Sequence, residues 1–321
     1  MTSFNRIISM DPQIEEIKKI SAQVALADST VLITGESGTG KELLAQAIHD
    51  ASERKYEAFT AINCAAIPEH LLESELFGYE AGAFTGAKIC GKIGKLERSN
   101  GGTVFFDEIG DMPLLLQTKI LRVLQDFCIE RVGGSVSKPL DIRIISATNK
   151  DLFQEVQHNT FRLDLYYRLN VIPIHIPPLR ARKNDILLLT KHFIEEYNTK
   201  MHRKVRFIDD TVKNILLDYH WPGNVRELRN VIEYSMNFCN AEVITQACLP
   251  RWMFFDTNLQ VGMSQYANLN LDLWEQALIR EALQRSKDKK SRVKAAADLL
   301  NINYATLYRK IKRHDIEIET I

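Results

Sequence analysis

Residues 31–41 read Val31-Leu-Ile-Thr-Gly-Glu-Ser-Gly-Thr-Gly-Lys41, and this segment is the most informative one for predicting the architecture of the chain. Residues 31–34 are a short apolar run that predicts a buried strand, and residues 41–49 have the spacing of a helix. The glycine-rich turn between them matches the phosphate-loop pattern through its lysine. Such a turn points backbone N–H groups at phosphates, and the following helix adds a favourable dipole. The expected nucleotide contacts are Gly35, Glu36, Ser37, Gly38, Thr39, Gly40, Lys41 and Glu42.

Within this stretch Lys41 is expected to reach the β- and γ-phosphates of a nucleotide. Glu42 stands where the general motif has Ser or Thr, which removes the usual hydroxyl ligand of Mg²⁺. Metal binding would then depend more on an acidic residue elsewhere. The alternative is a glycine-rich turn that binds nothing, and the position of the motif between a strand and a helix argues against it.

Further along the chain, the apolar run 103–106 ends in Asp107 and Glu108. In parallel sheets ligands bind at the carboxyl ends of strands. We therefore expect Asp107 to hold Mg²⁺ through water and Glu108 to polarise the attacking water as a general base. Taken alone, the pair reads as two solvated acids at a strand end. The phosphate loop in the same chain favours the catalytic interpretation.

Two weaker candidates follow. Asn149 follows another apolar strand, at 142–147, and could hydrogen-bond the γ-phosphate or the attacking water. An Asn at the end of a strand, however, usually serves to form a turn. Arg162 and Arg168 lie six residues apart. Arginines donated across a subunit boundary can stabilise phosphoryl-transfer charge, but their spacing alone favours two surface salt bridges.

Composition narrows the class of protein. The 321 residues are 45% hydrophobic and 26% charged, with 41 Lys+Arg against 41 Asp+Glu, so the chain can bury a core and its net charge favours no partner. Five scattered cysteines without a CxxC pair argue against a disulfide framework and a common zinc site. No apolar run reaches membrane-spanning length. We expect a soluble, cytoplasmic protein that no membrane anchors.

The pattern of elements predicts four segments. Residues 1–180 alternate strands and helices, which indicates an α/β domain with a mostly parallel sheet covered on both faces. From residue 185 to about residue 240 the pattern predicts helices only, and we expect residues 181–250 to form a helical lid. Residues 251–271 are rich in Asn, Gln and Ser and read as a linker. Residues 272–321 form a last helical domain.

The C-terminal segment is strongly basic. Residues 286–314 carry nine Lys/Arg and two Asp, and their pattern predicts a helix–turn–helix whose second helix enters the major groove of DNA. The alternative is a solvated basic tail. Asn303 would cap the second helix, Tyr304 and Thr306 would face base edges, and Arg309, Lys310, Lys312 and Arg313 would reach phosphates. The expected core is Ala296, Leu299, Leu300, Ile302, Leu307 and Ile311.

With these pieces in place, the chain resembles the bacterial sigma-54-dependent activators, or enhancer-binding proteins, which are AAA+ ATPases. The most specific motif is GAFTGA at 82–87, supported by GESGTGKE at 35–42 and FRLDLYYRL at 161–169. The resemblance covers about residues 7–250, and the C-terminal segment resembles a Fis-type domain. Glu42 is part of the sequence pattern of this family. In the C-terminal segment, many Fis-type domains have a basic residue where this one has Tyr304.

The resemblance implies roles that the residues alone do not. Lys41, Asp107 and Glu108 would bind and hydrolyse Mg-ATP, and Asn63 would be the switch asparagine that holds the catalytic glutamate in one nucleotide state. Asn149 would be the first sensor and Arg226 the second, on the lid. Arg162 and Arg168 would be arginine fingers that act on the ATP of a neighbouring copy. Sigma-54 would be contacted by Gly82, Ala83, Phe84, Thr85, Gly86 and Ala87.

Phe84 also has a plainer interpretation, in which its ring packs into the core of the chain. The family implies instead that this loop extends toward sigma-54 in one nucleotide state. The expected function is to bind upstream enhancer DNA, pair through residues 273–283, assemble a hexameric ring and convert the closed complex of sigma-54 RNA polymerase to the open one.

The chain begins almost at the ATPase domain. We therefore expect either a separate regulatory protein or a truncated sequence. Two other classes stay open: an ATP-driven unfoldase, which would not need residues 287–313, and a DNA-binding repressor with a degenerate ATPase, against which Lys41, Asp107 and Glu108 argue.

Overall fold

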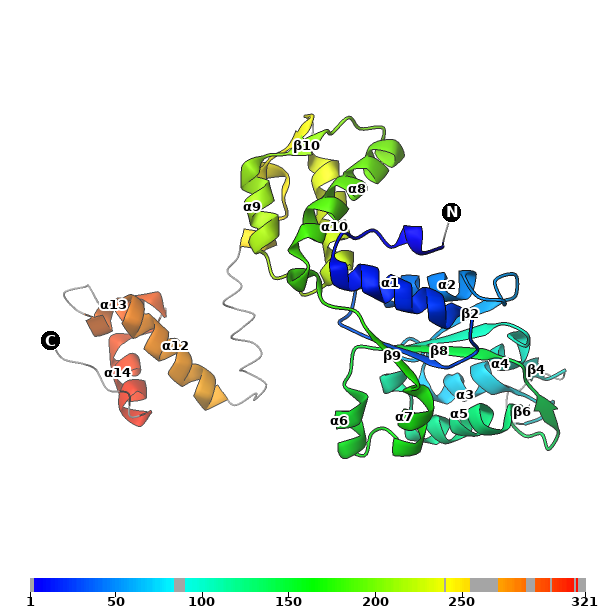
Figure 1. Ribbon diagram of the computed structural model, residues 1–321. Helices are drawn as coiled ribbons and strands as arrows, with labels where there is room; N and C mark the ends of the chain where they lie inside the picture. Colours follow the sequence, from blue (N-terminus) through cyan, green and yellow to red (C-terminus); the bar gives the residue numbers. More distant parts are fainter. Residues whose placement is uncertain are drawn as a thin grey trace. The chain divides into compact units, whose positions relative to one another are not determined.

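The computed structural model describes residues 3–83, 90–239, 241–254, 271–286, 292–300, 302–314 and 316. The chain divides into two compact units, residues 1–250 and residues 251–321, which are described separately below (Figure 1). Most of the predicted linker, residues 255–270, lies outside the described residues, and residues 251–254 form the short 3₁₀ helix η5 (Arg251–Phe254).

The first unit is built on a five-stranded sheet with strand order β2-β5-β8-β1-β9. All neighbouring strands pair in parallel, as the sequence predicts. Each strand contains apolar residues, and successive side chains along it point to opposite faces of the sheet. The strands are β1 (Val31–Thr34), β2 (Phe59–Asn63), β5 (Thr103–Asp107), β8 (Arg143–Thr148) and β9 (Ile172–His175).

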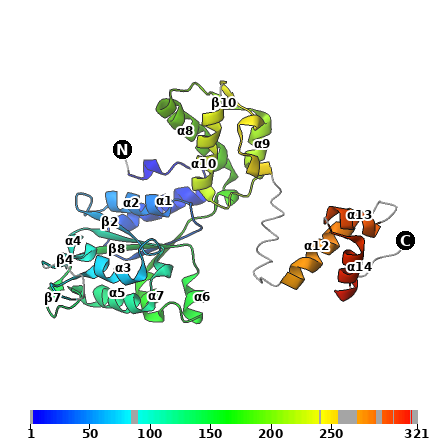
Figure 2. The same cartoon turned by 180° about the vertical axis from the view of Figure 1, so that it is seen from behind.

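Helices cover both faces of the sheet, in agreement with the predicted α/β fold (Figures 1 and 2). One core joins Phe105 to the apolar sides of α1 (Pro12–Ala25) and α2 (Lys41–Asp50), with η1 (Ser3–Arg6) at its edge. The other core joins Val104 and Phe106 to the remaining helices. These are α3 (Glu69–Phe77), α4 (Lys95–Arg98), α5 (Leu114–Asp126), α6 (Leu152–Gln157) and α7 (Leu163–Leu169).

Two short antiparallel hairpins project from this domain. The first pairs β3 (Gly78–Tyr79) with β4 (Lys92–Ile93), and the second pairs β6 (Cys128–Glu130) with β7 (Ser137–Pro139). The GAFTGA segment lies between β3 and β4, and of its six residues the structure describes Gly82 and Ala83. Phe84, Thr85, Gly86 and Ala87 lie outside the described residues, so both interpretations of Phe84 stay predictions.

The lid contains three helices, α8 (Lys183–Met201), α9 (Asp210–Asp218) and α10 (Asn224–Phe238). The prediction of helices alone is wrong in one detail, because β10 (Phe207–Ile208) pairs in parallel with β11 (Val243–Ile244). Two-residue strands carry no periodicity that a sequence could reveal. Three further 3₁₀ turns complete the unit, namely η2 (Ile109–Asp111), η3 (Leu179–Ala181) and η4 (Gln246–Cys248).

The described part of the second unit beyond η5 is a cluster of α12 (Leu271–Arg285), α13 (Arg292–Leu299) and α14 (Tyr304–Arg313). Its buried side chains confirm Ala296, Leu307 and Ile311 as core, with Leu300 and Ile302 packed at the edge. Leu299 is a wrong prediction, because it is 55% exposed. On α13 the buried face runs through Ala296 and Ala297, and Leu299 points well away from it. None of the helices described in either unit is long and apolar enough to cross a membrane.

Arg143 is a buried charged residue whose side chain bonds to the end of a helix. Its side chain is 1% exposed, and its two terminal nitrogens donate to the carbonyls of Val24 (2.8 Å) and Ala25 (2.9 Å) at the end of α1. Burial lowers the pKa of this guanidinium. Arg143 therefore supplies a donor to the carbonyl of Ala25 and a second donor to that of Val24, which also accepts the N–H of Ala27 at 3.1 Å.

We predict that Arg143→Met lowers the free energy of unfolding by about 3 kcal/mol, because two charged hydrogen bonds are lost and the carbonyl of Ala25 loses its side-chain donor. Urea unfolding measures the change. The control is Arg122→Met, at an exposed position of α5, where a shift within about 0.5 kcal/mol is expected. Equal stabilities of the two variants would contradict the assignment.

Candidate functional site

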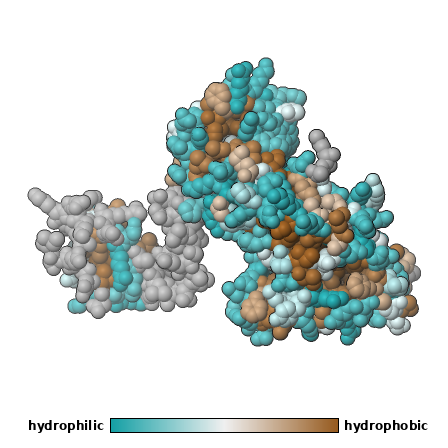
Figure 3. Space-filling view, viewed as in Figure 1, coloured by the Kyte–Doolittle hydropathy of each residue, from teal (hydrophilic) through white to brown (hydrophobic). Residues whose placement is uncertain are grey.

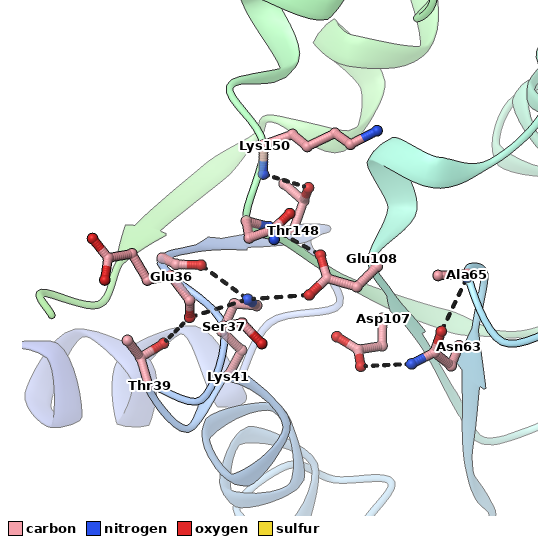
Figure 4. Close-up of polar contacts among 12 residues, drawn as sticks. Glu36, Ser37, Thr39, Lys41, Asn63, Ala65, Asp107, Glu108, Thr148 and Lys150 are labelled. Atoms are coloured by element: carbon pink, nitrogen blue, oxygen red, sulfur yellow. Dashed lines mark hydrogen bonds and ion pairs between the residues drawn. The ribbon is translucent and has the colours of Figure 1, made fainter. Parts of the chain in front are cut away.

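The parallel register brings four loops to one edge of the sheet. Asn63 pairs with Asp107 across β2 and β5, and Thr34 pairs with Thr148 across β1 and β8. Because all strands run in the same direction, the segments that follow them meet at the carboxyl edge. The phosphate loop, the acidic pair and the turn after β8 are therefore neighbours in space, although more than 100 residues separate the first from the last (Figure 4).

The phosphate loop follows β1 and packs closely on the lid. Gly38 has a φ of +79°, and a Cβ built on it would meet the carbonyl oxygen of Gly223 at 2.3 Å. No other residue fits there, because the backbone is left-handed and the space is filled. The side chain of Thr39 donates to the carbonyl of Glu36 at 2.8 Å and holds the loop in its turn.

Lys41 lies at the centre of the site. Its side chain is 6% exposed, and Nζ donates to the carbonyl of Gly35 at 2.9 Å. The same ammonium lies 3.5 Å from Oε1 of Glu108. A buried cation whose nearest carboxylate is this far away has capacity for a further anionic partner.

Glu108 connects two of the strand ends. Its Oε1 faces Lys41, and its Oε2 accepts the backbone N–H of Asn149 at 3.0 Å (Figure 4). The backbone of Glu108 is left-handed, with a φ of +50°, which is unusual for a residue with a long side chain. Backbone strain of this kind gathers at functional sites. The predicted sensor Asn149 thus meets Glu108 through its main chain.

Asp107 is held from the other side by Asn63. Nδ2 of Asn63 donates to Oδ2 of Asp107 at 3.3 Å, and its Oδ1 accepts two N–H groups, from Ala65 and Ala66, both at 3.0 Å. In this conformation the predicted switch asparagine contacts Asp107, while Glu108 is held by Lys41 and Asn149. Burial raises the pKa of the Asp107 carboxyl, the charge of Glu108 raises it further, and Lys41 opposes both.

The lid contributes Arg226, whose Nη1 donates to Oγ of Ser37 at 3.1 Å. The backbone N–H of Val225 also donates to the carbonyl of Gly38 at 3.0 Å. The start of α10 is therefore bonded directly to the phosphate loop. This places the predicted second sensor against the loop that it is expected to sense.

Sequence reasoning missed a second connection, centred on Asn224. This fully buried side chain donates to Oε2 of Glu36 (3.1 Å) and to the carbonyl of Ser37 (3.0 Å), and it accepts the N–H of Leu179 at 2.8 Å. Glu36 is also paired with both terminal nitrogens of Arg180, which lowers the pKa of its carboxyl. The run Trp221-Pro-Gly-Asn marks a tight turn, and this turn is the signal that could have revealed it.

A cavity of about 380 Å³ lies over these residues. Its polar wall is the phosphate loop with Asp107 and Glu108, and its apolar wall includes Ile8 and Ile14. This volume and the mixture of apolar and convergent polar groups are typical of a small-molecule site. The cavity can hold a phosphorylated ligand with an apolar base.

The two predicted arginine fingers do not line this cavity. Arg162 is paired with Asp164, at 2.7 and 3.0 Å, and Arg168 donates to the carbonyl of Leu124 at 2.8 and 3.2 Å. Both lie at α7, on the other face of the sheet from α2. The chain therefore does not bring them to its own phosphate loop.

Among the described residues, no group of three or more His, Cys, Asp or Glu side chains could form a metal cage. Asp107 nevertheless suits Mg²⁺, which proteins commonly bind through one or two carboxylates together with substrate phosphates. The residues present fit this kind of metal ion and no dedicated cage.

In the second unit, Oδ1 of Asn303 accepts the N–H of Ala305 at 2.9 Å, so the predicted cap of α14 is confirmed. Tyr304, Arg309, Lys312 and Arg313 are exposed, and Thr306 is half-buried. Lys310 differs from the other basic residues, because its ammonium is paired with Glu275 of α12. This ion pair is the first cause of a lowered Glu275 pKa and turns Lys310 toward the inside of the unit.

Comparison with known families assigns the three parts of the chain. Residues 7–175 match the Sigma-54 interaction domain, residues 180–260 the AAA+ ATPase lid domain, and residues 271–314 the Fis family of bacterial regulatory proteins. The chain belongs to the sigma-54 interaction family. The predicted AAA+ fold, with helical lid and C-terminal helix–turn–helix, is therefore confirmed.

Individual relatives of this family agree. A signal-transduction and transcriptional-control protein of Clostridium beijerinckii is 44% identical over 98% of this chain and 49% of its own length. Regulatory protein AtoC of Escherichia coli (strain K12) is 42% identical over 98% of this chain and 68% of its own length. The chain thus spans about half of the first relative.

Among solved structures, NtrX from Brucella abortus in complex with ATP superposes with a TM-score of 0.71 and 32% identity, over 96% of this chain and 69% of NtrX. A second structure of NtrX contains ADP. The fold of this chain is therefore one in which a relative binds adenine nucleotides.

We predict that Asn224→Asp lowers the free energy of unfolding by about 2 kcal/mol at pH 7, because a buried carboxylate would replace the amide that donates to Glu36. Adding Glu36→Gln should restore part of the loss, since the new amide can donate in the opposite direction. Urea unfolding of the double-mutant cycle gives the coupling, expected at about 1 kcal/mol. Strictly additive losses would show that the two side chains do not interact.

Proposed function

We propose that this chain is an ATP-dependent activator of sigma-54 RNA polymerase that binds upstream DNA. The observation that carries the proposal is the convergence of Lys41, Asp107 and Glu108 on one cavity, in a member of the sigma-54 interaction family. Adenine nucleotides in NtrX support the choice of ligand. The low-dielectric, preorganised edge of the sheet is suited to stabilising the charge of phosphoryl transfer.

In this proposal each residue at the sheet edge has one task. Lys41 neutralises phosphate oxygens, and Asp107 holds a Mg²⁺ ion through its water. Glu108 accepts a proton from the attacking water, which requires its carboxylate form. Asn63 and Asn149 keep the two carboxylates apart and oriented. Because the pKa of Asp107 is raised, its carboxylate form is lost at a higher pH than that of an ordinary aspartate. As the pH falls, metal binding should therefore begin to weaken at a higher pH than it would at an ordinary aspartate.

Arg162 and Arg168 are proposed to complete the site of a neighbouring copy. They lie away from the phosphate loop of their own chain, beside exposed apolar side chains that include Tyr167 (64% exposed) and Val171 (54%). Figure 3 shows apolar surface between α1 and β9. Exposed apolar patches mark contact sites. A head-to-tail contact that closes gives a ring, for which we propose six copies.

We predict that Arg168→Ala reduces ATP turnover by about 10³-fold, the range known for arginine fingers, while nucleotide still binds. Steady-state hydrolysis and fluorescent-nucleotide titration measure the two properties. Arg206→Ala, at an exposed position of the lid, is the matched control and should leave turnover unchanged. Full turnover by a wild-type chain proven to be monomeric would exclude a shared site.

The segment Gly82–Ala87 is proposed to contact sigma-54. The described residues around it are firmly held: Arg131 donates to Glu97 at 2.8 Å and to Glu80 at 3.2 Å, at the base of the segment. Asn63 caps the turn that leads into α3, and α3 leads to β3. A change at Asp107 or Glu108 could therefore reach this segment through packed elements.

We predict that Thr85→Ala abolishes open-complex formation while ATP hydrolysis stays within about twofold of wild type. The measurement is in vitro transcription from a sigma-54 promoter, with hydrolysable and non-hydrolysable ATP. Thr199→Ala, on the lid, is the control. Normal activation by Thr85→Ala would disprove the contact, and transcription without hydrolysis would favour a plain DNA-binding regulator. ATP-driven unfolding of unrelated proteins would favour the unfoldase alternative.

The C-terminal unit is proposed to bind enhancer DNA through α14 and to pair with a second copy through α12. The charges of Arg309, Lys312 and Arg313 would neutralise phosphates, so binding should weaken steeply with salt. We further propose that control comes from another protein or from a further part of a longer chain. The relatives extend beyond the region that this chain matches, which is consistent with either.

A further inference from the structure

Two tyrosines on α14 form a ring pair that faces outward. Tyr304 and Tyr308 are four residues apart and are 49% and 51% exposed. Their ring centroids are 6.2 Å apart, with 24° between the ring planes. An offset pair of this kind is a stable arrangement, so the two rings present one continuous apolar surface.

The core of the unit does not use this surface. Leu307 and Ile311 carry the buried side of α14, and the adjoining side is tied to α12, where Glu275 binds Lys310 and lies 2.9 Å from Nε2 of His314. The ring pair lies on the opposite flank of the buried stripe. Figure 1 shows α12 and α13 packed together with α14, and among the described residues of the unit both rings stay about half exposed.

The surroundings of the ring pair are basic. Arg309, Lys312 and Arg313 are exposed on the same helix, and Asn303 caps its start. The match to the Fis family of regulatory proteins makes α14 the second helix of a helix–turn–helix, which enters the major groove of DNA. An apolar surface surrounded by cations therefore faces a partner that carries phosphates.

The major groove offers one apolar group, the C5-methyl of thymine. We propose that Tyr304 and Tyr308 together read thymine methyl groups, so that Tyr308 is a specificity-determining residue and α14 selects A·T pairs where the rings lie. This inference rests on the proposed DNA binding. It assigns to Tyr304 an apolar contact through its ring, in place of a hydrogen bond from its hydroxyl group.

Removing the methyl groups tests the proposal directly. A binding site is first selected from random duplex DNA with the full 321-residue chain, and each thymine is then replaced by deoxyuridine, which keeps all hydrogen bonds. Wild-type affinity should fall about fourfold for each methyl group contacted, the factor for one buried CH₂-sized group. Gel-shift titration at fixed salt measures the ratio of affinities for the thymine and uracil sites.

Matched variants separate the ring from the charge and from the hydroxyl group. Tyr308→Ala should bring the thymine-to-uracil ratio close to one at the contacted position, whereas Tyr308→Phe should keep it. Lys312→Ala should weaken binding to both sites equally and reduce the salt slope by about one. Circular dichroism of each variant checks that the unit is folded.

Each result decides a different statement. If the chain binds no selected DNA, the proposed DNA-binding function fails. If it binds but the ratio is one for the wild type, the ring pair does not read thymine and the inference is overturned. The thymine-to-uracil ratio of affinities could stay unchanged in Tyr308→Ala while the molecular mass of the DNA-free assembly differs from that of the wild type. This result would assign the surface to contact between copies and would also overturn the inference.

Discussion

The structure depends on the register of the parallel sheet. Because Asn63 is paired with Asp107, and Thr34 with Thr148, the phosphate loop, the acidic pair and Asn149 reach the same edge. A slip of one residue in β5 would turn Asp107 and Phe106 each to the face opposite to the one it occupies now. This would disrupt both the site and the core. The two apolar cores on either side of the sheet stabilise this register. The packing of apolar side chains in these cores thus fixes the positions of Lys41, Asp107 and Glu108.

The site joins parts of the chain that could move relative to one another. Glu108 bonds to the phosphate-loop lysine and to the N–H of Asn149, while Asn224 and Arg226 bond the lid to the same loop. A ligand in the cavity would lie next to the residues that make these bonds. The described contacts therefore provide a physical route from a phosphate group to the lid on one side and, through Asn63 and α3, to the hairpin of β3 and β4 on the other.

Much of this could be predicted from the sequence, because the strands of the sheet are rich in apolar residues and the phosphate loop, Asp107 and Glu108 are contiguous motifs. The two-residue strands could not, since they have no period. The contact of Asn224 with Glu36 spans 188 residues, and no local pattern reports it. The helical pattern predicts Leu299 as core, but an apolar residue at the end of a short helix can point away from the buried face. The sequence also places Lys310 on the basic surface, because its ion-pair partner, Glu275, lies on a different helix.

We propose that one copy of the chain completes the nucleotide site of the next. Mixing two inactive variants tests this proposal: Lys41→Ala keeps the proposed arginine fingers but loses the proposed phosphate-binding lysine, and Arg168→Ala keeps the lysine but loses a proposed finger. In a head-to-tail assembly with random mixing, about a quarter of the interfaces combine an intact lysine with an intact finger. We predict that the equimolar mixture recovers about that share of wild-type ATP turnover, whereas a mixture as inactive as its two components would show that no site is shared between copies.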